Sequence, residues 1–140
     1  MLSQSIGSLE DADTVVSVPS QTSVADAAAL MVAKGASAVL VVENEALAGI
    51  FTEHDIVSRV IAPGLDAAEV QVVDVMTREP LTGDPGMLLG HALLVMHERG
   101  IRHLPIVRGG SIFGIVCARD ALDPELEEFV CEERRRESYR

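Results

Sequence analysis

The chain has 140 residues and a formal net charge of −11, with 22 acidic against 11 basic residues. A negative field of this size disfavours nucleic acids and anionic membrane surfaces as partners, although a small anionic ligand responds to local charge instead. No apolar run approaches the ~18 residues that cross a bilayer, and the first residues lack a basic region followed by an apolar stretch. We therefore expect a cytoplasmic protein, whose length suits one domain or one close pair of half-domains.

The opening of the chain is polar and then β-prone. Residues 1–13 predict a tail that is frayed or loosely docked. Residues 14–18 are rich in β-branched side chains, which favour a strand. Pro19 is expected to end this strand, because proline offers no N–H to a ladder.

A helix is predicted over residues 23–34. Ser23 and Asp26 form a variant of the capping box, in which the hydroxyl accepts a backbone N–H and the acid lies in the first turn. Gly35 directly after Lys34 is a C-terminal stop signal. The apolar residues recur at helical spacing and share one face: Val24, Ala27, Ala28 and Met31.

Two strands and a second helix complete the first unit. Residues 38–42 are a continuous valine-rich run, which is typical of a strand buried on both sides. After a polar turn, residues 47–51 predict the next strand and residues 52–61 a helix. The unit is therefore β-α-β-β-α over residues 14–61, and the Pro- and Gly-containing stretch 62–72 is predicted to be a linker.

The same pattern returns 65 residues later, over residues 73–122. Positions 24–57 and 89–122 share seven identities. The pairs are Ala27 and Ala92, Met31 and Met96, Gly35 and Gly100, Val42 and Val107, Gly49 and Gly114, Ile50 and Ile115, and Asp55 and Asp120. We therefore expect a helix over 87–99, strands over 103–107 and 112–116, and, after the repeat, a charged C-terminal helix over 123–140.

The two cysteines show no spacing typical of a metal site or a redox pair. Both Cys117 and Cys131 are expected to be reduced, because no export signal precedes them. Cys117 is expected to lie in a buried strand as a small core residue. No metal site is predicted.

Each copy resembles a cystathionine-β-synthase (CBS) domain, and the pair resembles a Bateman module. The motifs that carry the resemblance are Asp74-Val75-Met76-Thr77, Gly100-Ile101-Arg102-His103-Leu104-Pro105-Ile106-Val107, the closing Gly114-Ile115-Val116-Cys117-Ala118-Arg119-Asp120, and its counterpart Gly49-Ile50-Phe51-Thr52-Glu53-His54-Asp55. The resemblance implies an α/β (α+β) fold of two β-α-β-β-α repeats packed as a pseudo-twofold pair. It also implies a regulatory module, not an enzyme, that binds an adenine-bearing ligand between the copies, with AMP the first expectation and ATP, NAD and S-adenosylmethionine as others.

Thr52 and Asp55 are the first candidate site residues. They follow a strand at the start of a helix, where free backbone N–H groups favour phosphate. The Thr52 hydroxyl can donate to a phosphate oxygen, and Asp55 can accept from the two vicinal hydroxyls of a ribose, as an acid does in dinucleotide folds. The alternative is that Thr52 or Glu53 simply caps the helix and that Asp55 is an acid of its first turn.

Arg102 and His103 are the candidate phosphate ligands of the same cleft. The resemblance implies that basic residues here meet phosphate and face the ribose acid of the other copy. Arginine suits this role because its planar fork donates twice. The alternative is a solvated basic pair at the rim.

The second cleft is expected to be weaker. It combines the ribose acid Asp120 with Ser37 and Ala38, which supply no cation, and Cys117 stands where the first copy has Thr52. A thiol is a poor donor to phosphate. His54 and Arg119 precede the two acids, and the sequence leaves open whether they point at phosphate or at solvent.

Two functions of different kinds follow from these residues. The first is a ligand sensor whose conformation or dimer packing is read by an effector protein. The alternative is a structural homodimerisation module with degenerate clefts and no ligand. In both, a homodimer is expected, and no catalytic residue is predicted because no nucleophile motif or metal frames a general base.

Overall fold

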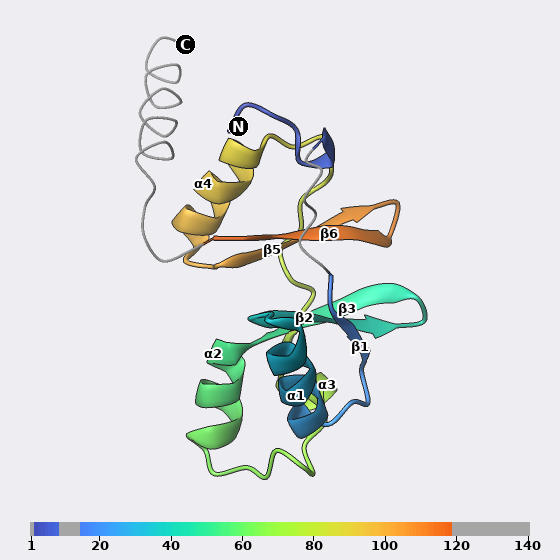
Figure 1. Ribbon diagram of the computed structural model, residues 1–140, viewed down its shortest axis with the longest axis vertical. Coiled ribbons are helices and arrows are strands. Elements are labelled where there is room, and N and C mark those ends of the chain that lie inside the picture. Colours follow the sequence, from blue (N-terminus) through green and yellow to red (C-terminus); the bar gives the residue numbers. More distant parts are fainter. Residues whose placement is uncertain (1, 9–14, 119–140) are drawn as a thin grey trace. The chain divides into compact units, whose positions relative to one another are not determined.

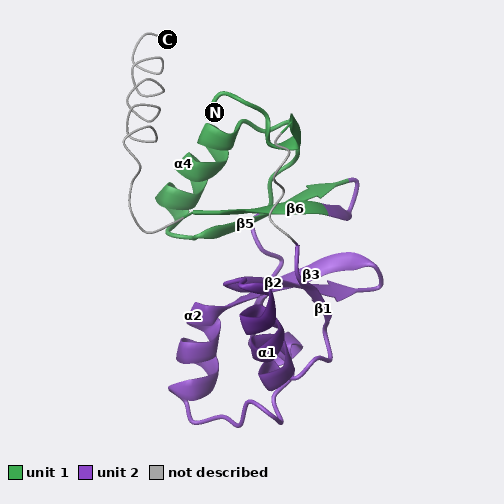
Figure 2. Ribbon diagram, viewed as in Figure 1, with its two compact units in different colours: residues 1–13, 82–108, 113–140 green, residues 14–81, 109–112 purple. Residues whose placement is uncertain are grey.

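The computed structural model describes residues 2–8 and 15–118. The chain forms two compact units, named here as in Figure 2. Unit 2 contains residues 14–81 and 109–112 and carries most of the first sequence repeat, whereas unit 1 contains residues 1–13, 82–108 and 113–140 and carries most of the second. The charged helix predicted over 123–140 lies outside the described residues.

Unit 2 has a mixed four-stranded sheet with helices on one side (Figure 1). Its strands, in the order in which they lie in the sheet, are β1 (Ser17–Pro19), β2 (Ala38–Glu43), β3 (Ala46–Thr52) and β4 (Thr77–Arg78). Strand β1 runs parallel to β2, and the other neighbours are antiparallel. The predicted strands are thus confirmed in unit 2 with small shifts, of which the largest is the first strand, at 17–19 instead of 14–18.

Helix α1 (Val24–Lys34) ends at the predicted residue and begins one residue after the predicted start, Ser23, which is its N-cap. The Asp26 N–H donates to Ser23 Oγ over 3.1 Å, which satisfies one of the free donors of the first turn. Gly35 ends the helix with φ of 63°, a left-handed conformation that favours glycine. The buried side chains of the helix are Val24, Ala27 and Met31, which confirms the predicted apolar face.

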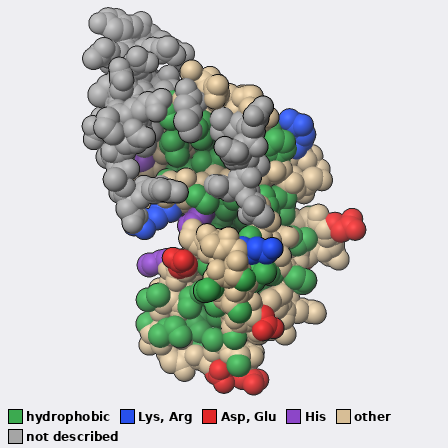
Figure 3. All heavy atoms as spheres, viewed as in Figure 1, with side chains coloured by type: hydrophobic (Ala, Val, Ile, Leu, Met, Phe, Trp, Pro, Cys, Tyr) green, Lys and Arg blue, Asp and Glu red, His purple; other side chains and the backbone are tan. Residues whose placement is uncertain are grey.

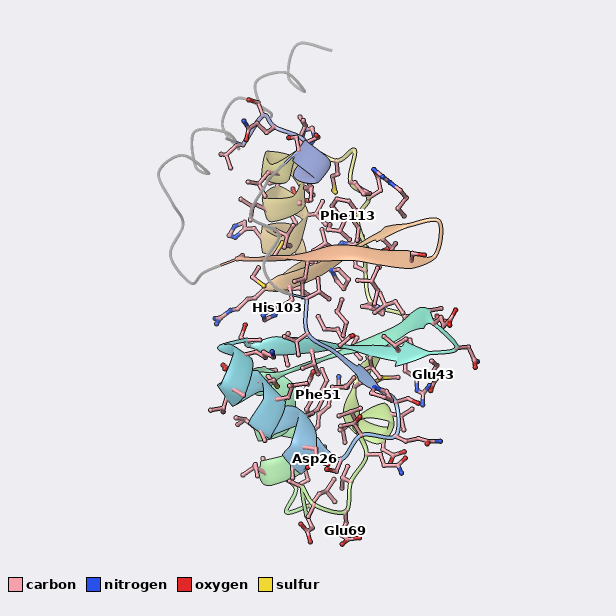
Figure 4. The ribbon with its side chains drawn as sticks, turned by 45° about the vertical axis from the view of Figure 1, so that its right-hand side comes forward. Asp26, Glu43, Phe51, Glu69, His103 and Phe113 are labelled. Carbon is pink, nitrogen blue, oxygen red and sulfur yellow. The ribbon has the colours of Figure 1, made fainter. Side chains whose placement is uncertain are left out.

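The core of unit 2 lies between the sheet and its helices. Phe51 on β3 is fully buried and points toward the helices (Figure 4). Its buried neighbours are mostly valines, as the run on β2 predicts: Val16, Val18, Val24, Val39, Val41, Val60, Val72 and Val75, with Ala27, Met31 and Met76. Acidic residues such as Asp26, Glu43 and Glu69 point outward (Figure 4).

The second helix of unit 2 departs from the predicted single α-helix over 52–61. Its first turn is α2 (Glu53–Asp55), and the rest is a π-helix, η2 (Ile56–Ile61). The widened ladder is seen where the Ala62 N–H donates to the Val57 carbonyl, five residues back. The Ser58 hydroxyl donates to the His54 carbonyl over 2.8 Å, a side-chain bond that competes with the normal helical one.

Residues 62–81 also belong to unit 2. Helix α3 (Val72–Val75) buries Val72 completely in the core, and the Val72 N–H donates to the Thr22 carbonyl over 2.8 Å. Strand β4 then pairs with β3. The stretch that leads into the second repeat is therefore packed on the first. The repeat boundaries themselves, 14–61 and 73–122, stay predictions.

Unit 1 repeats the helix and hairpin of unit 2. Its elements are η1 (Ile6–Ser8), α4 (Leu89–Arg99), β5 (His103–Arg108) and, from residue 113 on, β6 (Ser111–Cys117). Gly100 ends α4 with φ of 65°, as Gly35 ends α1. A parallel bridge joins Gly83 to Ile106, which is the counterpart of the pairing of Val18 with Val41 one repeat earlier.

Of the two alternatives for the N-terminal tail, frayed or loosely docked, residues 2–8 follow the second and are docked in unit 1. Leu2 and Ile6 are buried in the same cluster as α4 and β5. The Leu89 N–H donates to the Gln4 carbonyl over 3.0 Å, and the Gly90 N–H donates to the Leu2 carbonyl over 2.9 Å. Only a few apolar side chains hold this segment, too few to show a helical or strand periodicity in the sequence. The polar composition therefore does not reveal that the segment is packed in the core.

These bonds mirror those of unit 2. There, the Val24 N–H donates to the Val70 carbonyl, and the Ala25 N–H donates to the Ala67 carbonyl. In each unit, the free amides at the start of the repeat helix are satisfied by the segment that precedes the other repeat in the sequence. Two stretches far from their helices in sequence are thus required to complete the two cores.

Candidate functional site

The strongest candidate site is the junction of β3 and α2, where Thr52 and Asp55 form a complete capping box. Asp55 Oδ2 accepts the Thr52 N–H over 2.9 Å and the Thr52 hydroxyl over 3.1 Å. The Asp55 N–H in turn donates to Thr52 Oγ1 over 3.3 Å. The capping role weighed from the sequence is therefore present, and both side chains are held in fixed positions.

The carboxylate of Asp55 is buried with its charge. The residue is 6% exposed, which is rare for an aspartate unless it is paired. Its partner is Arg59, one turn on, whose Nε lies 3.6 Å from Asp55 Oδ1. Arg59 was not among the predicted site residues, although an acid and an arginine four residues apart on a helix are a spacing that indicates an ion pair.

Arg59 also contacts the backbone of another segment. Its Nη1 donates to the Val75 carbonyl over 3.1 Å and to the Met76 carbonyl over 3.0 Å. These carbonyls lie at the C-terminal end of α3, where the helix leaves acceptors without intrahelical donors. Asp55, Arg59 and the end of α3 thus form one polar network in unit 2.

The carboxylate retains capacity to accept further hydrogen bonds. An ionised carboxylate offers about four acceptor positions. Oδ2 takes two bonds from Thr52, and the contact from Arg59 to Oδ1 is long at 3.6 Å. The chemistry of Oδ1 therefore suits a further hydroxyl donor.

The backbone before β2 holds the start of this helix. The Glu53 N–H donates to the Ser37 carbonyl over 3.1 Å. The equivalent bond in unit 1 joins the Ala118 N–H to the Arg102 carbonyl over 2.8 Å. Ser37 and Arg102 therefore occupy matching places in the two units, as the repeat predicts.

The predicted basic pair lies at the start of β5 in unit 1. Arg102 is exposed and His103 is partly buried. His103, which is labelled in Figure 4, is the first residue of the strand. Asp55 and Thr52 belong to unit 2. That Arg102 and His103 meet the ligand of Asp55 stays a prediction.

The remaining predicted residues divide into two groups. His54 is exposed in the first turn of the helix, and its carbonyl accepts the Ser58 hydroxyl. Arg119 and Asp120 lie outside the described residues. Their assignments to phosphate and ribose stay predictions.

The expectation that Cys117 is a core residue is wrong. Cys117 is exposed at the end of β6, whereas the preceding Val116 is buried. Side chains alternate between the two faces of a strand, so burial of Gly114 and Val116 turns Cys117 outward. Within the described ranges, no cluster of His, Cys, Asp and Glu could hold a metal ion, and no helix is long and apolar enough to cross a membrane.

The CBS domain family matches residues 9–62 and 72–125. The chain therefore belongs to this family and carries two CBS domains, a pair of the class that acts in regulation and ligand sensing. Among curated relatives, an uncharacterized protein of Methanopyrus kandleri is 34% identical over 126 residues, which are 89% of this chain and 64% of the relative. A CBS domain-containing protein of Bacillus subtilis is 39% identical over 102 residues, 73% of this chain and 71% of the relative.

Several other relatives are much longer, so that the chain spans only 14–21% of their length. Two solved structures show the same fold. An uncharacterized conserved protein of Pyrococcus horikoshii is 29% identical with a TM-score of 0.76, covering 96% of this chain and 95% of its own. A CBS domain protein of Pyrobaculum aerophilum, complexed with AMP, is 18% identical with a TM-score of 0.77, covering 92% and 99%.

Proposed function

We propose that this CBS pair senses an adenine nucleotide, with AMP as the first ligand to test. Thr52 and Asp55 would bind the phosphate and ribose, and Arg102 and His103 would meet the phosphate from the second domain. His54 would stand beside them at the helix start. A resident catalytic cofactor has no place in this function, because the nucleotide is the signal and the module performs no reaction.

The observation that carries the proposal is the buried, charged and pre-positioned carboxylate of Asp55. Ribose presents two vicinal hydroxyls, and a carboxylate held by a capping box can accept from them without first losing side-chain freedom. The Thr52 hydroxyl lies 3.1 Å from Asp55 Oδ2, and its rotation toward a phosphate would leave the Thr52 N–H bond to the acid in place. The AMP complex of the Pyrobaculum relative supports the choice of ligand.

A second nucleotide site around Asp120 and Arg119 is proposed to be weaker. Cys117 takes the place of Thr52 there, and a thiol donates poorly to phosphate. The first domain also supplies Ser37 and Ala38 where the second supplies a cation. We expect this site to favour a nucleoside or to stay empty.

The module is further proposed to act as a cytoplasmic homodimer that signals to a separate effector protein. Hydrophobic side chains gather on the surface over the helices of unit 2 (Figure 3). On the helices of this unit, Val32 of α1 is 83% exposed, and Val57 and Ile61 of η2 are each 61% exposed. Exposed apolar groups of this kind favour association with a second copy. A purely structural dimer without ligand is the alternative function.

Calorimetric titration with AMP distinguishes the two functions. Wild-type protein should bind AMP, and Asp55→Ala should weaken binding by about 1–3 kcal/mol, the range for a hydrogen bond to a charged group. Asp120→Ala is the matched control and should change AMP affinity much less. Absence of AMP, ATP and NAD binding to the wild type would favour the structural dimer, and loss of binding only in Asp120→Ala would place the ligand at the other acid.

A further inference from the structure

Arg59 is the one polar side chain of the Asp55 network that the proposed ligand site does not use. Its guanidinium reaches in two directions at once. Nε lies 3.6 Å from Asp55 Oδ1, while Nη1 donates to the carbonyls of Val75 and Met76 over 3.1 and 3.0 Å. A planar fork can serve both sides in this way, whereas an ammonium acts as a point charge.

The segment that receives these bonds, residues 72–78, joins the core of unit 2 to the chain that continues into unit 1. Val72 anchors its beginning in the core. Its end pairs with β3, where Thr77 lies opposite Ile50 and Arg78 opposite Gly49. Between these anchors, α3 stops and β4 begins, and the two carbonyls bound by Arg59 lie at this change of structure.

We propose that Arg59 is a positioning residue that couples the carboxylate of Asp55 to residues 72–78. The place of the guanidinium depends on the acid on one side and on the two carbonyls on the other. A hydroxyl that donates to Asp55 Oδ1 would occupy its second acceptor position and weaken the long contact from Arg59 Nε, so that the guanidinium would shift against α3. Binding of a ligand hydroxyl to Asp55 would thereby change the hydrogen bonding of residues 72–78, the segment that leads into the second domain. This last step rests on the proposed function.

A ligand-free cycle of variants tests the coupling. Hydrogen–deuterium exchange is measured in peptides covering residues 72–79 of the wild type, Asp55→Asn, Arg59→Met and the double variant. Each single change should speed exchange there, by about tenfold for Arg59→Met, because a charge-assisted hydrogen bond is lost. The double variant should exchange no faster than Arg59→Met. Unchanged exchange in Arg59→Met, or effects that multiply in the double variant, would overturn the proposal.

Arg78 provides a matched control. Its Nη2 donates to the Val73 carbonyl over 3.2 Å, so it holds the same segment without contact to Asp55. Arg78→Met combined with Asp55→Asn should show the product of the two single effects. If Arg59→Met does not fold, Arg59→Lys replaces it, and the proposal then requires that Asp55→Asn has a smaller effect on residues 72–79 in the Arg59→Lys background than in the wild type.

Addition of AMP separates this proposal from the proposed function. In the wild type, saturating AMP should alter exchange in residues 72–79, and in Arg59→Met it should bind without that change. If AMP binds and alters the segment equally in both proteins, Arg59 is not the coupling residue. If AMP does not bind the wild type, the proposed nucleotide function fails, while the ligand-free cycle still decides the role of Arg59.

Discussion

Units 1 and 2 end their helices and form their hairpins at matching positions, while the side chains at other matching positions differ. The repeat helices end at Gly35 and Gly100 with φ of 63° and 65°, and each following strand is bonded to its partner in a hairpin. The chemistry at matching places differs, since Thr52 corresponds to Cys117 and the exposed Val32 to His97. A few local conformations therefore suffice to specify the repeat, and the other positions are available for different functions in each domain.

We expect the largest effect on stability from a substitution in the N-terminal segment. Ile6 in unit 1 holds the place that Val72 holds in unit 2, and both are buried. Ile6→Ala should lower the free energy of unfolding by about 2–5 kcal/mol, because it removes buried methylene groups and leaves a cavity. Chemical denaturation measures this, with Ser3→Ala as an exposed control in the same segment. A change below 1 kcal/mol, on the scale of a surface substitution, would mean that residues 2–8 are not part of the core.

The paired glycines of the hairpins test whether the two units are packed alike. A Cβ at Gly49 would lie 2.5 Å from Met76 Sδ and 2.7 Å from the Thr77 carbonyl, so Gly49→Ala should cost about 1–3 kcal/mol through overpacking. At Gly114, a Cβ meets no atom of the described residues within 4 Å. Gly114→Ala should therefore cost less in a thermal unfolding experiment. Equal losses would show that both strands are covered equally closely.

Arg102 tests the difference between the two domains in binding. Only the second domain offers a cation at this place, because its counterpart is Ser37. Arg102→Ala should weaken the binding of AMP by about tenfold and that of adenosine much less, since the bond proposed for Arg102 is to phosphate. The difference between the loss of affinity for AMP and the loss for adenosine should become smaller as salt screens the charge of the arginine. Equal weakening of both ligands at all salt concentrations would argue against a phosphate contact.

We expect the smallest effect on stability from substitutions in the hairpin turns. Asn44 and Glu45 have φ of 50° and 64°, and the matching residues are Gly109 and Gly110, with φ of 57° and 83°. Glutamate is strained in this left-handed conformation, whereas glycine is not. Glu45→Gly should raise the free energy of unfolding by about 0.5 kcal/mol, because relief of strain exceeds the entropy cost of glycine. The reciprocal control, Gly110→Ala, should be destabilising.

Features that depend on neighbours in the chain were predictable from the sequence. Ser23 caps α1 and Gly35 ends it because the partners of each cap lie within a few residues. The strands on either side of each hairpin follow from runs of apolar residues, and the motifs that recur in both copies carry the resemblance to the CBS family. Thr52 and Asp55 were found from their spacing at the start of a predicted helix and from the recurring motif that they belong to, and the structure adds the capping box that joins them.

Features that depend on distant segments were decided by the tertiary structure alone. Residues 2–8 and 67–78 each supply carbonyls to a helix that local sequence does not identify, and Arg59 donates to carbonyls 16 and 17 residues away. A backbone carbonyl is the same group in every residue, so the sequence carries no trace of which one an arginine or an amide will meet. The outward turn of Cys117 was likewise set by packing, because alternation along β6 becomes readable only when the buried face is known.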